Sequence, residues 1–307
     1  MSLRFTHEPL TAIWAALAAA LGAVEAGAVV GAEVPHPDLA AQRYDGEPTA
    51  AGRARPLEAW AELAAHLGAT LLMPEPAGDR VRLRFRKLSA RSWHRESLPS
   101  GHPEKYGADS DFARACKFEQ PGFLAAWRDA LGFLDLPWPA RVLSLGCHLG
   151  AELAALRAQV DTGSAGALLL GVDHSASAIA EARRRHPGPP FDFQVHDLAH
   201  GPPEGLFDLV IAINVLHSRA LDGRALLRAV VKRHLAAEGR VLLGFPNARH
   251  VDHRLRMGAR PKHAQGPELS QLLVDVMHAR RYLHQQRFKT LATGTGTVLL
   301  AGRRLSP

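Results

Sequence analysis

The chain is predicted to be an α/β protein with a largely parallel sheet, and three features of its second half predict this class. From residue 141 onward, apolar runs of strand length alternate with stretches of helical spacing. A glycine turn at residues 146–150 joins the first run to a helix, and each of the next three runs ends in Asp or Asn. Because the carboxyl ends of parallel strands meet at one edge of a sheet, these polar residues are expected to line a ligand crevice.

The first hundred residues are predicted to form a small α+β unit. Residues 8–30 and 55–67 have helical character, and the Pro-, Gly- and charge-rich residues 34–53 between them predict a loop. Residues 69–73 and 81–85 flank a turn and predict a β-hairpin. No motif in this region indicates a function.

The second half supplies the strands and helices of the predicted sheet. The expected strands are residues 142–145, 168–172, 191–196, 207–213, 239–245, 288–293 and 297–302. The expected helices are residues 121–134, 151–159, 223–234 and 267–286, and residues 248–266 are expected to be a basic loop. A Gly-Thr-Gly turn at residues 294–296 predicts that the sheet ends in an antiparallel hairpin.

Composition narrows the class of protein. An apolar fraction of 47% with 22% charged residues is ordinary for a soluble globular chain. Two cysteines, Cys116 and Cys147, are too few for a disulfide framework and fit a reducing compartment, so a cytoplasmic protein is expected. The apolar run of residues 10–24 is shorter than the roughly 20 residues of a membrane span, so we interpret it as a buried alanine-rich helix.

Positive charge is concentrated at the end of the chain. Residues 248–307 carry 11 Lys and Arg against three Asp and Glu, which exceeds the net charge of +7 of the whole chain. Such a segment can meet an anionic partner, or it can be an arginine-rich solvated surface.

Four motifs in order resemble the class I S-adenosylmethionine-dependent methyltransferases. They are VLSLGCHLG at residues 142–150, LLLGVDHS at 168–175, FQVHDL at 193–198 and FDLVIAINVLH at 207–217. The resemblance covers roughly residues 121–303 and lies in the combination of motifs. It implies a Rossmann-like sheet with helices on both faces and a C-terminal antiparallel hairpin. We therefore expect an N-terminal α+β region (1–88), a connecting or lid segment (89–120) and a methyltransferase domain (121–307).

The resemblance also implies S-adenosylmethionine as the cofactor and a role for each strand end. Gly146 and Gly150 would let the backbone approach the methionine part, and Asn214 would lie beneath that part. Asp173 would accept hydrogen bonds from the ribose hydroxyls, and Asp197 from the adenine amine. The full set of expected cofactor contacts is Ser144, Leu145, Gly146, Cys147, His148, Gly150, Asp173, His174, Asp197, Leu198 and Asn214.

Two residues depart from the family pattern. Ser144 stands where the family usually has an acidic residue, so it can bind the ammonium group of the cofactor only without charge. His148 stands where the family has glycine; it fits if the turn is left-handed, but its ring would occupy space and weaken or alter cofactor binding. The turn alone fits a dinucleotide site equally well, whereas Asp197 and the terminal hairpin favour a methyltransferase.

Further residues are candidates for catalysis and acceptor binding. His217 lies where a general base would sit, if the acceptor must lose a proton. Tyr106 and Lys117, in a polar segment that also holds Trp93 and His94, are candidate lid or substrate contacts, as is Asn247 after the fifth strand. His250 and His253 have a metal-like spacing, but no cluster of carboxylates or thiols accompanies them, so no metal site is expected.

The acceptor stays open between two classes. A small molecule is slightly favoured, and whether it is anionic stays open. RNA or another nucleic acid is the alternative, and seven basic residues would serve it: Arg249, Arg254, Arg256, Arg260, Lys262, Arg280 and Arg281. A catalytically inactive cofactor-binding protein and a nicotinamide-dependent oxidoreductase are further alternatives. Neither the acceptor atom nor the oligomeric state follows from the sequence.

Overall fold

The computed structural model describes residues 2–37, 45–89, 103–159, 163, 165–218, 220–251, 254–258 and 269–305. The chain forms two compact units, Met1–Arg95 with His250–Arg254, and Glu96–Arg249 with Leu255–Pro307. Each unit encloses its own hydrophobic core. The expected divisions after residues 88 and 120 stay a prediction.

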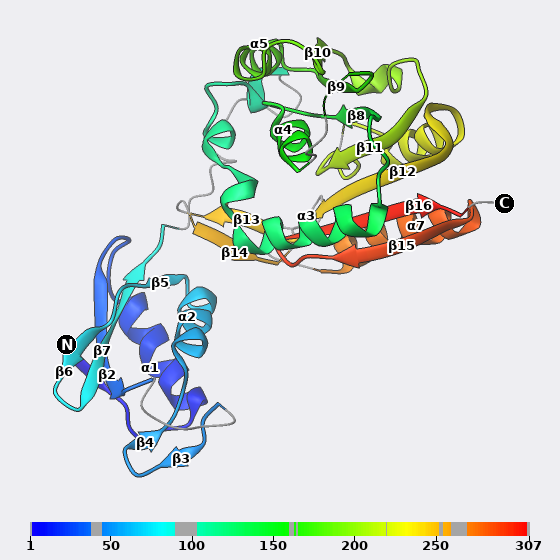
Figure 1. Cartoon of the computed structure of the whole chain (residues 1–307). Helices are drawn as coiled ribbons and strands as arrows, with labels where there is room; N and C mark the ends of the chain where they lie inside the picture. The colour runs from blue at the N-terminus through cyan, green and yellow to red at the C-terminus, as the bar shows by residue number, and fades with distance from the viewer. Residues whose placement is uncertain are drawn as a thin grey trace. The chain divides into compact units, whose positions relative to one another are not determined.

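The first unit is a small sheet with two helices. Its strands are β1 Ser2–Arg4, β2 Val29–Pro35, β5 Ala69–Leu71, β6 Glu75–Ala77 and β7 Arg80–Lys87, and its helices are α1 Leu10–Gly22 and α2 Leu57–His66. The strand order is β1-β2-β7-β5, and β6 also pairs with β7. β1 runs parallel to β2, whereas the other pairs are antiparallel. Figure 1 shows β2, β5, β6 and β7 with the helices α1 and α2. The predicted hairpin of residues 69–73 and 81–85 corresponds to β5 and β7.

Alternation along β7 explains why only one face of this sheet is buried. Val81, Leu83 and Phe85 point into a core with Ile13 and Trp60 from the two helices. The arginines between these three residues occupy the other face, as expected for a half-buried antiparallel strand.

Two predictions in the first unit were wrong in their bounds. The first helix ends at Gly22 and does not continue to residue 30. Gly27, at φ +90°, turns the chain, and the β-branched Val29 and Val30 then pair with β7 as part of β2. The predicted loop of residues 34–53 contains the end of β2 and a short hairpin, β3 Pro48–Thr49 with β4 Gly52–Arg53.

The second unit contains a seven-stranded sheet in the order β10-β9-β8-β11-β12-β16-β15. Its strands are β8 Arg141–Leu145, β9 Leu168–Asp173, β10 Phe191–Val195, β11 Phe207–Ile213, β12 Leu235–Pro246, β15 Phe288–Thr293 and β16 Thr297–Arg304. Neighbouring strands are parallel except that β16 runs antiparallel to both β12 and β15. The terminal hairpin is thus confirmed, and strand order reverses at β8, where a crevice is expected.

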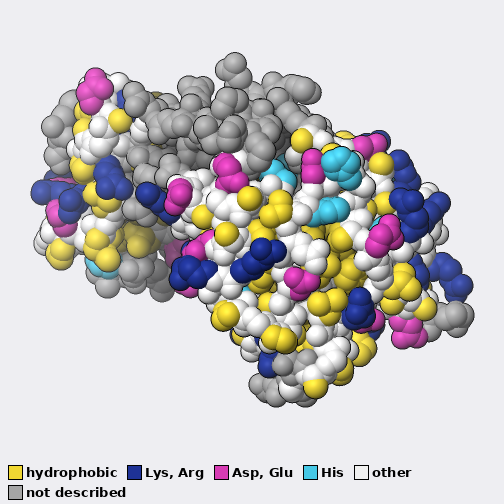
Figure 2. Space-filling view, turned by 90° about the horizontal axis from the view of Figure 1, so that it is seen from above, with side chains coloured by type: hydrophobic (Ala, Val, Ile, Leu, Met, Phe, Trp, Pro, Cys, Tyr) yellow, Lys and Arg dark blue, Asp and Glu magenta, His cyan; other side chains and the backbone are white. Residues whose placement is uncertain are grey.

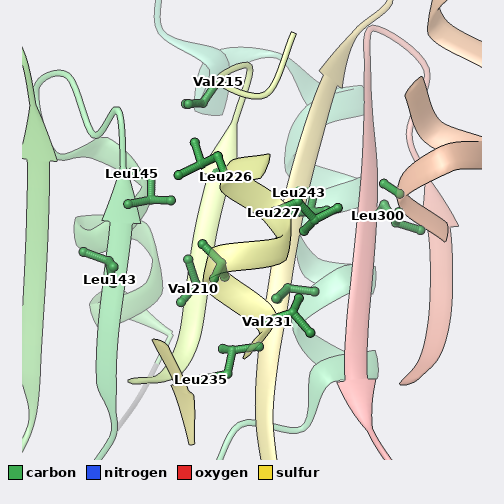
Figure 3. Close-up of a cluster of buried hydrophobic side chains, with 14 of the residues drawn as sticks. Leu143, Leu145, Val210, Val215, Leu226, Leu227, Val231, Leu235, Leu243 and Leu300 are labelled. Carbon is green, nitrogen blue, oxygen red and sulfur yellow. The ribbon is translucent and has the colours of Figure 1, made fainter. Parts of the chain in front are cut away.

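Helices cover both faces of this sheet, and each face has its own core. The helices are α3 Pro121–Leu134, α4 Ala151–Ala158, α5 Ala176–Arg185, α6 Gly223–Ala229 and α7 Ser270–Gln285. Helices α3, α4 and α5 pack on one face, and α6 and α7 on the other. Figure 3 shows Leu226, Leu227 and Val231 lying over Val210 and Leu243 of the strands. The predicted fold class is therefore confirmed.

The structure extends or corrects several elements. β12 begins at Leu235, four residues earlier than predicted, and the turn Val230–His234 before it is a π-helix. The predicted basic loop contains a two-stranded sheet, β13 Ala248–Val251 with β14 Arg254–Met257. In the described part of the predicted lid segment, three 3-10 helices lie at Pro103–Tyr106, Asp111–Arg114 and Lys117–Glu119. No helix within the described ranges is long and apolar enough to cross a bilayer.

Candidate functional site

The glycine turn after β8 is shaped by left-handed backbone. Gly146, His148 and Gly150 have φ of +63°, +50° and +80°. A Cβ on Gly146 would lie 2.7 Å from Cγ2 of Val215, and one on Gly150 would lie 2.7 Å from the Phe193 ring. Both positions therefore require glycine, and the turn presents bare backbone where α4 begins.

Asp173, the last residue of β9, holds this turn in place. Its Oδ2 accepts the backbone N–H of His148 at 3.0 Å, and its Oδ1 accepts that of Ser175 at 3.0 Å. His174 Nδ1 lies 3.3 Å from the same Oδ1. Burial raises the pKa of Asp173, but the hydrogen bonds from His174, Ser175 and His148 outweigh burial and lower that pKa overall. The carboxylate is thus ionised at neutral pH and retains lone pairs for a ligand.

Asp197, which follows β10, is placed differently. It is exposed, and its Oδ1 accepts the N–H of Ala199 at 2.9 Å, which caps the 3-10 helix Leu198–His200. Leu198 is half-buried beside it. The structure therefore gives Asp197 a turn role, and its predicted contact with adenine stays a prediction.

Two asparagines at the ends of the next strands present unpaired oxygens. Asn214, with φ +59°, follows β11, and its backbone N–H donates to Gly244 O at 2.9 Å. Asn247 follows β12, and its Nδ2 donates to Thr295 O at 2.8 Å. Among the described residues, the Oδ1 atoms of both have no hydrogen-bond partner although they are buried. Buried polar atoms are seldom left unpaired, so these oxygens indicate ligand positions.

The remaining predicted residues of the turn are mostly buried. Ser144 pairs in register with Gly171 and Ile211 and is 2% exposed, and Leu145 beside it is also buried. Burial, Asp173 and Glu152 raise the pKa of Cys147 well above its ordinary value, so its thiol stays protonated. Cys147 therefore packs the turn and is not an activated nucleophile.

The segment of residues 103–119 lies on the glycine turn. The Glu104 carboxylate accepts Ser175 Oγ at 3.0 Å and also Ser177 Oγ, at the start of α5. Ser177 Oγ in turn accepts the N–H of Ala108 at 3.0 Å. These bonds lower the pKa of Glu104, with that from Ser177 contributing most. The predicted lid segment is thus attached beside the end of β9.

Aromatic rings continue this contact to the turn itself. The Phe112 ring meets His148 edge-on, with centroids 5.0 Å apart, and meets Tyr106 edge-on at 5.2 Å. Burial raises the pKa of Tyr106 and lowers that of His148. Tyr106 is therefore brought to the predicted site.

Two opposite charges lie near the turn. Burial lowers the pKa of Lys117, while the charge of Glu152 raises it. Burial raises the pKa of Glu152, in the first turn of α4, and Lys117 partly offsets this effect. Both side chains are half-buried. Lys117 thus supplies positive charge beside the turn. His217 is half-buried in the turn after β11, and its catalytic role stays a prediction.

Several contributors were not predicted from the sequence: Glu104, Phe112, Glu152, Ser175 and Ser177. Ser175 had a local signal, because it directly precedes a helix and its Oγ accepts the N–H of Ala178 at 3.1 Å as an N-cap. Glu104 had none, since its partners lie more than 70 residues away in sequence.

Some predictions fall outside the described residues. Trp93, His94, His253, Arg260 and Lys262 lie there, and so do the side chains of Arg249, His250 and Arg254. Where the structure describes the chain, no group of three or more His, Cys, Asp or Glu side chains is arranged to hold a metal ion.

The sheet with its terminal antiparallel hairpin fits the predicted Rossmann-like methyltransferase fold, and comparison with known proteins agrees. Residues 143–241 match the family model described as "Methyltransferase domain". The trans-aconitate 2-methyltransferase of Methylobacterium nodulans is 37% identical over 149 residues, which are 48% of this chain and 54% of that protein. This chain thus spans about half the length of that curated relative.

Solved structures of methyltransferases are also similar, at low identity. Magnesium protoporphyrin IX methyltransferase of Synechocystis PCC 6803 with bound SAM is 22% identical with a TM-score of 0.40, covering 60% of this chain and 80% of its own. The N-methyltransferase NodS of Bradyrhizobium japonicum WM9 with S-adenosyl-L-homocysteine is 18% identical with a TM-score of 0.42, covering 62% and 91%. Residues 143–241, which run from β8 to β12 of the sheet, therefore carry a methyltransferase domain.

Proposed function

We propose that the protein transfers a methyl group from S-adenosylmethionine to a small anionic molecule. The observation that carries the cofactor part is a set of buried polar atoms that the described residues leave unpaired at strand ends: His148 Nε2, Asn214 Oδ1 and Asn247 Oδ1. His148 follows β8, Asn214 follows β11 and Asn247 follows β12, and these three strands are consecutive in the sheet. Unpaired polar atoms gathered at one sheet edge favour a polar ligand there.

The residues of the turn fit the parts of this cofactor. Bare backbone at Gly146 and Gly150 leaves room that a Cβ would fill, next to the start of α4, where a carboxylate is favoured. The ionised Asp173 can accept from the two ribose hydroxyls. Asn214 Oδ1 can accept from the ammonium group, which would offset the missing charge at Ser144. The chemistry supplied by S-adenosylmethionine is an in-line displacement at its methyl carbon, for which positioning gives much of the acceleration.

Two observations favour a small anionic acceptor. The relative that matches this chain is named for trans-aconitate, a carboxylate anion. In addition, Lys117 brings a cation to the glycine turn at a half-buried position, where charge is weakly screened by water. A positive charge held there would orient an anionic group of the acceptor.

The first experiment is calorimetry with S-adenosylmethionine and S-adenosylhomocysteine, followed by transfer of labelled methyl groups to a panel of carboxylates that includes trans-aconitate. We expect saturable binding and a labelled methyl ester. Lys117→Met should raise the KM for the carboxylate by about tenfold, the value of one charge-assisted bond. Lys105→Met is the matched control, since Lys105 is on the same segment and lies over the Tyr106 ring. Absence of binding to either cofactor form contradicts the proposal, and binding of NADH instead would favour an oxidoreductase.

A nucleic-acid acceptor is the second candidate, because of the basic C-terminal residues. Met277, Arg280, Arg281, His284 and Gln285 line a groove on α7. However, α7 leads into β15, which runs parallel to β12, so this end of α7 lies at the amino edge of the sheet, away from the glycine turn. On the face drawn in Figure 2, Lys and Arg occur in small groups interspersed with Asp and Glu. Retention on an RNA column that falls steeply with salt, together with methylation of RNA, would favour this candidate.

A further inference from the structure

His148 is a non-glycine residue held in a left-handed conformation. Its φ is +50°, and its backbone N–H donates to Asp173 Oδ2 at 3.0 Å. Glycine would adopt this backbone without steric cost, so the imidazole is retained against a local preference. Strained positions of this kind are often explained by what the side chain contacts.

The ring is fixed by the segment that lies on the turn. Phe112 meets it edge-on at 5.0 Å, and a hydrogen bond joins the ring to the backbone of Tyr106. The same segment is attached to α5 through Glu104 and Ser177. The imidazole therefore connects the glycine turn to residues 103–119 and has little freedom to move.

One nitrogen of the His148 ring makes no hydrogen bond to the described residues. Among the described residues, His148 Nε2 is buried and has no hydrogen-bond partner, which leaves Nδ1 to face the Tyr106 backbone. Burial lowers the pKa of the ring, although the charge of Asp173 opposes this effect, and the charges of Lys117 and Arg185 add to it. A neutral ring that donates from Nδ1 presents Nε2 as an acceptor.

We infer that His148 is a cofactor-binding residue, whose Nε2 accepts a hydrogen bond from a ribose hydroxyl of bound S-adenosylmethionine while its ring fixes residues 103–119 over the site. The inference rests on the proposed function. The ribose is chosen because the backbone of His148 is already bonded to Asp173, the carboxylate proposed for the ribose hydroxyls. The ring thus adds a contact that glycine at this position would not provide. The alternative is that the ring occupies space that the cofactor needs.

Substitution of His148 distinguishes a ring that binds the cofactor from a ring that obstructs it. His148→Gly should weaken S-adenosylhomocysteine binding by about tenfold, the loss of one hydrogen bond and of the ordered segment. His148→Asn tolerates the left-handed backbone but is too short to reach the position of Nε2, so it should weaken binding similarly. Equal or tighter binding by His148→Gly would overturn the inference and identify the ring as an obstruction. Melting temperatures check folding, which glycine at this φ is expected to preserve.

A second probe tests the choice of the ribose. Methylthioadenosine has the ribose and the adenine but lacks the amino-acid part, so His148→Gly should weaken its binding by the same factor. A variant that loses affinity for S-adenosylhomocysteine alone would overturn the ribose contact. In the wild type, S-adenosylhomocysteine should slow amide exchange in residues 103–119, and His148→Gly should abolish this protection. If the wild type binds neither ligand, the proposed function fails, which is a distinct outcome.

Discussion

The two halves of the site differ in how their polar groups are satisfied. Beside the ends of β8 and β9, the carboxylates of Asp173 and Glu104 accept several hydrogen bonds from the protein itself, and only His148 Nε2 is left unpaired there among the described residues. At the ends of β11 and β12, the Oδ1 atoms of Asn214 and Asn247 have no partner among the described residues. The first half is therefore organised before any ligand binds, as suits a constant cofactor. In the second half, the two Oδ1 atoms can gain a hydrogen bond only from a ligand, such as the proposed acceptor or the methionine part of the proposed cofactor.

Removing the carboxylate of Asp173 should have the largest effect on cofactor binding. Asp173→Ala should weaken S-adenosylhomocysteine binding on the order of 100-fold, because the ribose contacts and the turn both lose a charged acceptor. Asp208→Asn is the matched control: its Oδ2 also accepts a backbone N–H, from Arg141 at 2.8 Å, but at the amino end of the sheet. Calorimetry should show cofactor affinity unchanged in the control. Equal losses in both variants would mean that Asp173 acts only through folding.

Adding a single methyl group at Gly146 in the glycine turn should lower the free energy of unfolding. Gly146→Ala combines a left-handed backbone with a Cβ 2.7 Å from Val215, and should destabilise the fold by about 2–3 kcal/mol. Gly188→Ala, at φ +73° with nothing within 4 Å of its Cβ, isolates the backbone cost, which is about 1 kcal/mol. Urea unfolding measures both. Similar losses of unfolding free energy in the two variants would show that Val215 moves aside and that the turn is less rigid than its geometry indicates.

The second half of the site should affect turnover more than cofactor binding. Asn247→Ala should leave the Kd for S-adenosylhomocysteine within about twofold and lower kcat/KM for the acceptor by about tenfold, because one acceptor contact is lost. Steady-state kinetics with the carboxylate found in the panel measures this. A large loss of cofactor affinity would instead place Asn247 in the first half.

The smallest effect concerns pH. The hydrogen bond to Asp173 raises the pKa of His174 above its ordinary value of 6.5. Its contribution to stability is therefore fully present below that value and is lost as pH rises through the raised pKa. His174→Ala should thus cost more unfolding free energy at about pH 5.5 than at about pH 9. Urea unfolding of the wild type and the variant at both pH values measures this difference, and an equal cost at the two values would contradict the prediction.

Local patterns in the sequence were sufficient for most of the sheet. Strand Phe207–Ile213 and helix Pro121–Leu134 have the predicted bounds, because a continuous apolar run and a Pro-initiated amphipathic stripe depend on neighbouring residues alone. His148 was expected to fit only if the turn is left-handed, and its φ of +50° meets that condition. By contrast, the strand Val29–Pro35 was partly assigned to a helix, since its pairing partner β7 lies about 50 residues away.

The sequence by itself determined the sheet, the glycine turn and the order of polar strand ends, since each follows from side-chain periodicity and from the conformations that glycine permits. Only the tertiary structure placed Glu104 on Ser175 and Ser177, and Phe112 on His148. Contacts between distant segments depend on how the helices pack, and no local spacing encodes them. For the same reason, the unpaired oxygens of Asn214 and Asn247 became visible only once their surroundings had been assembled.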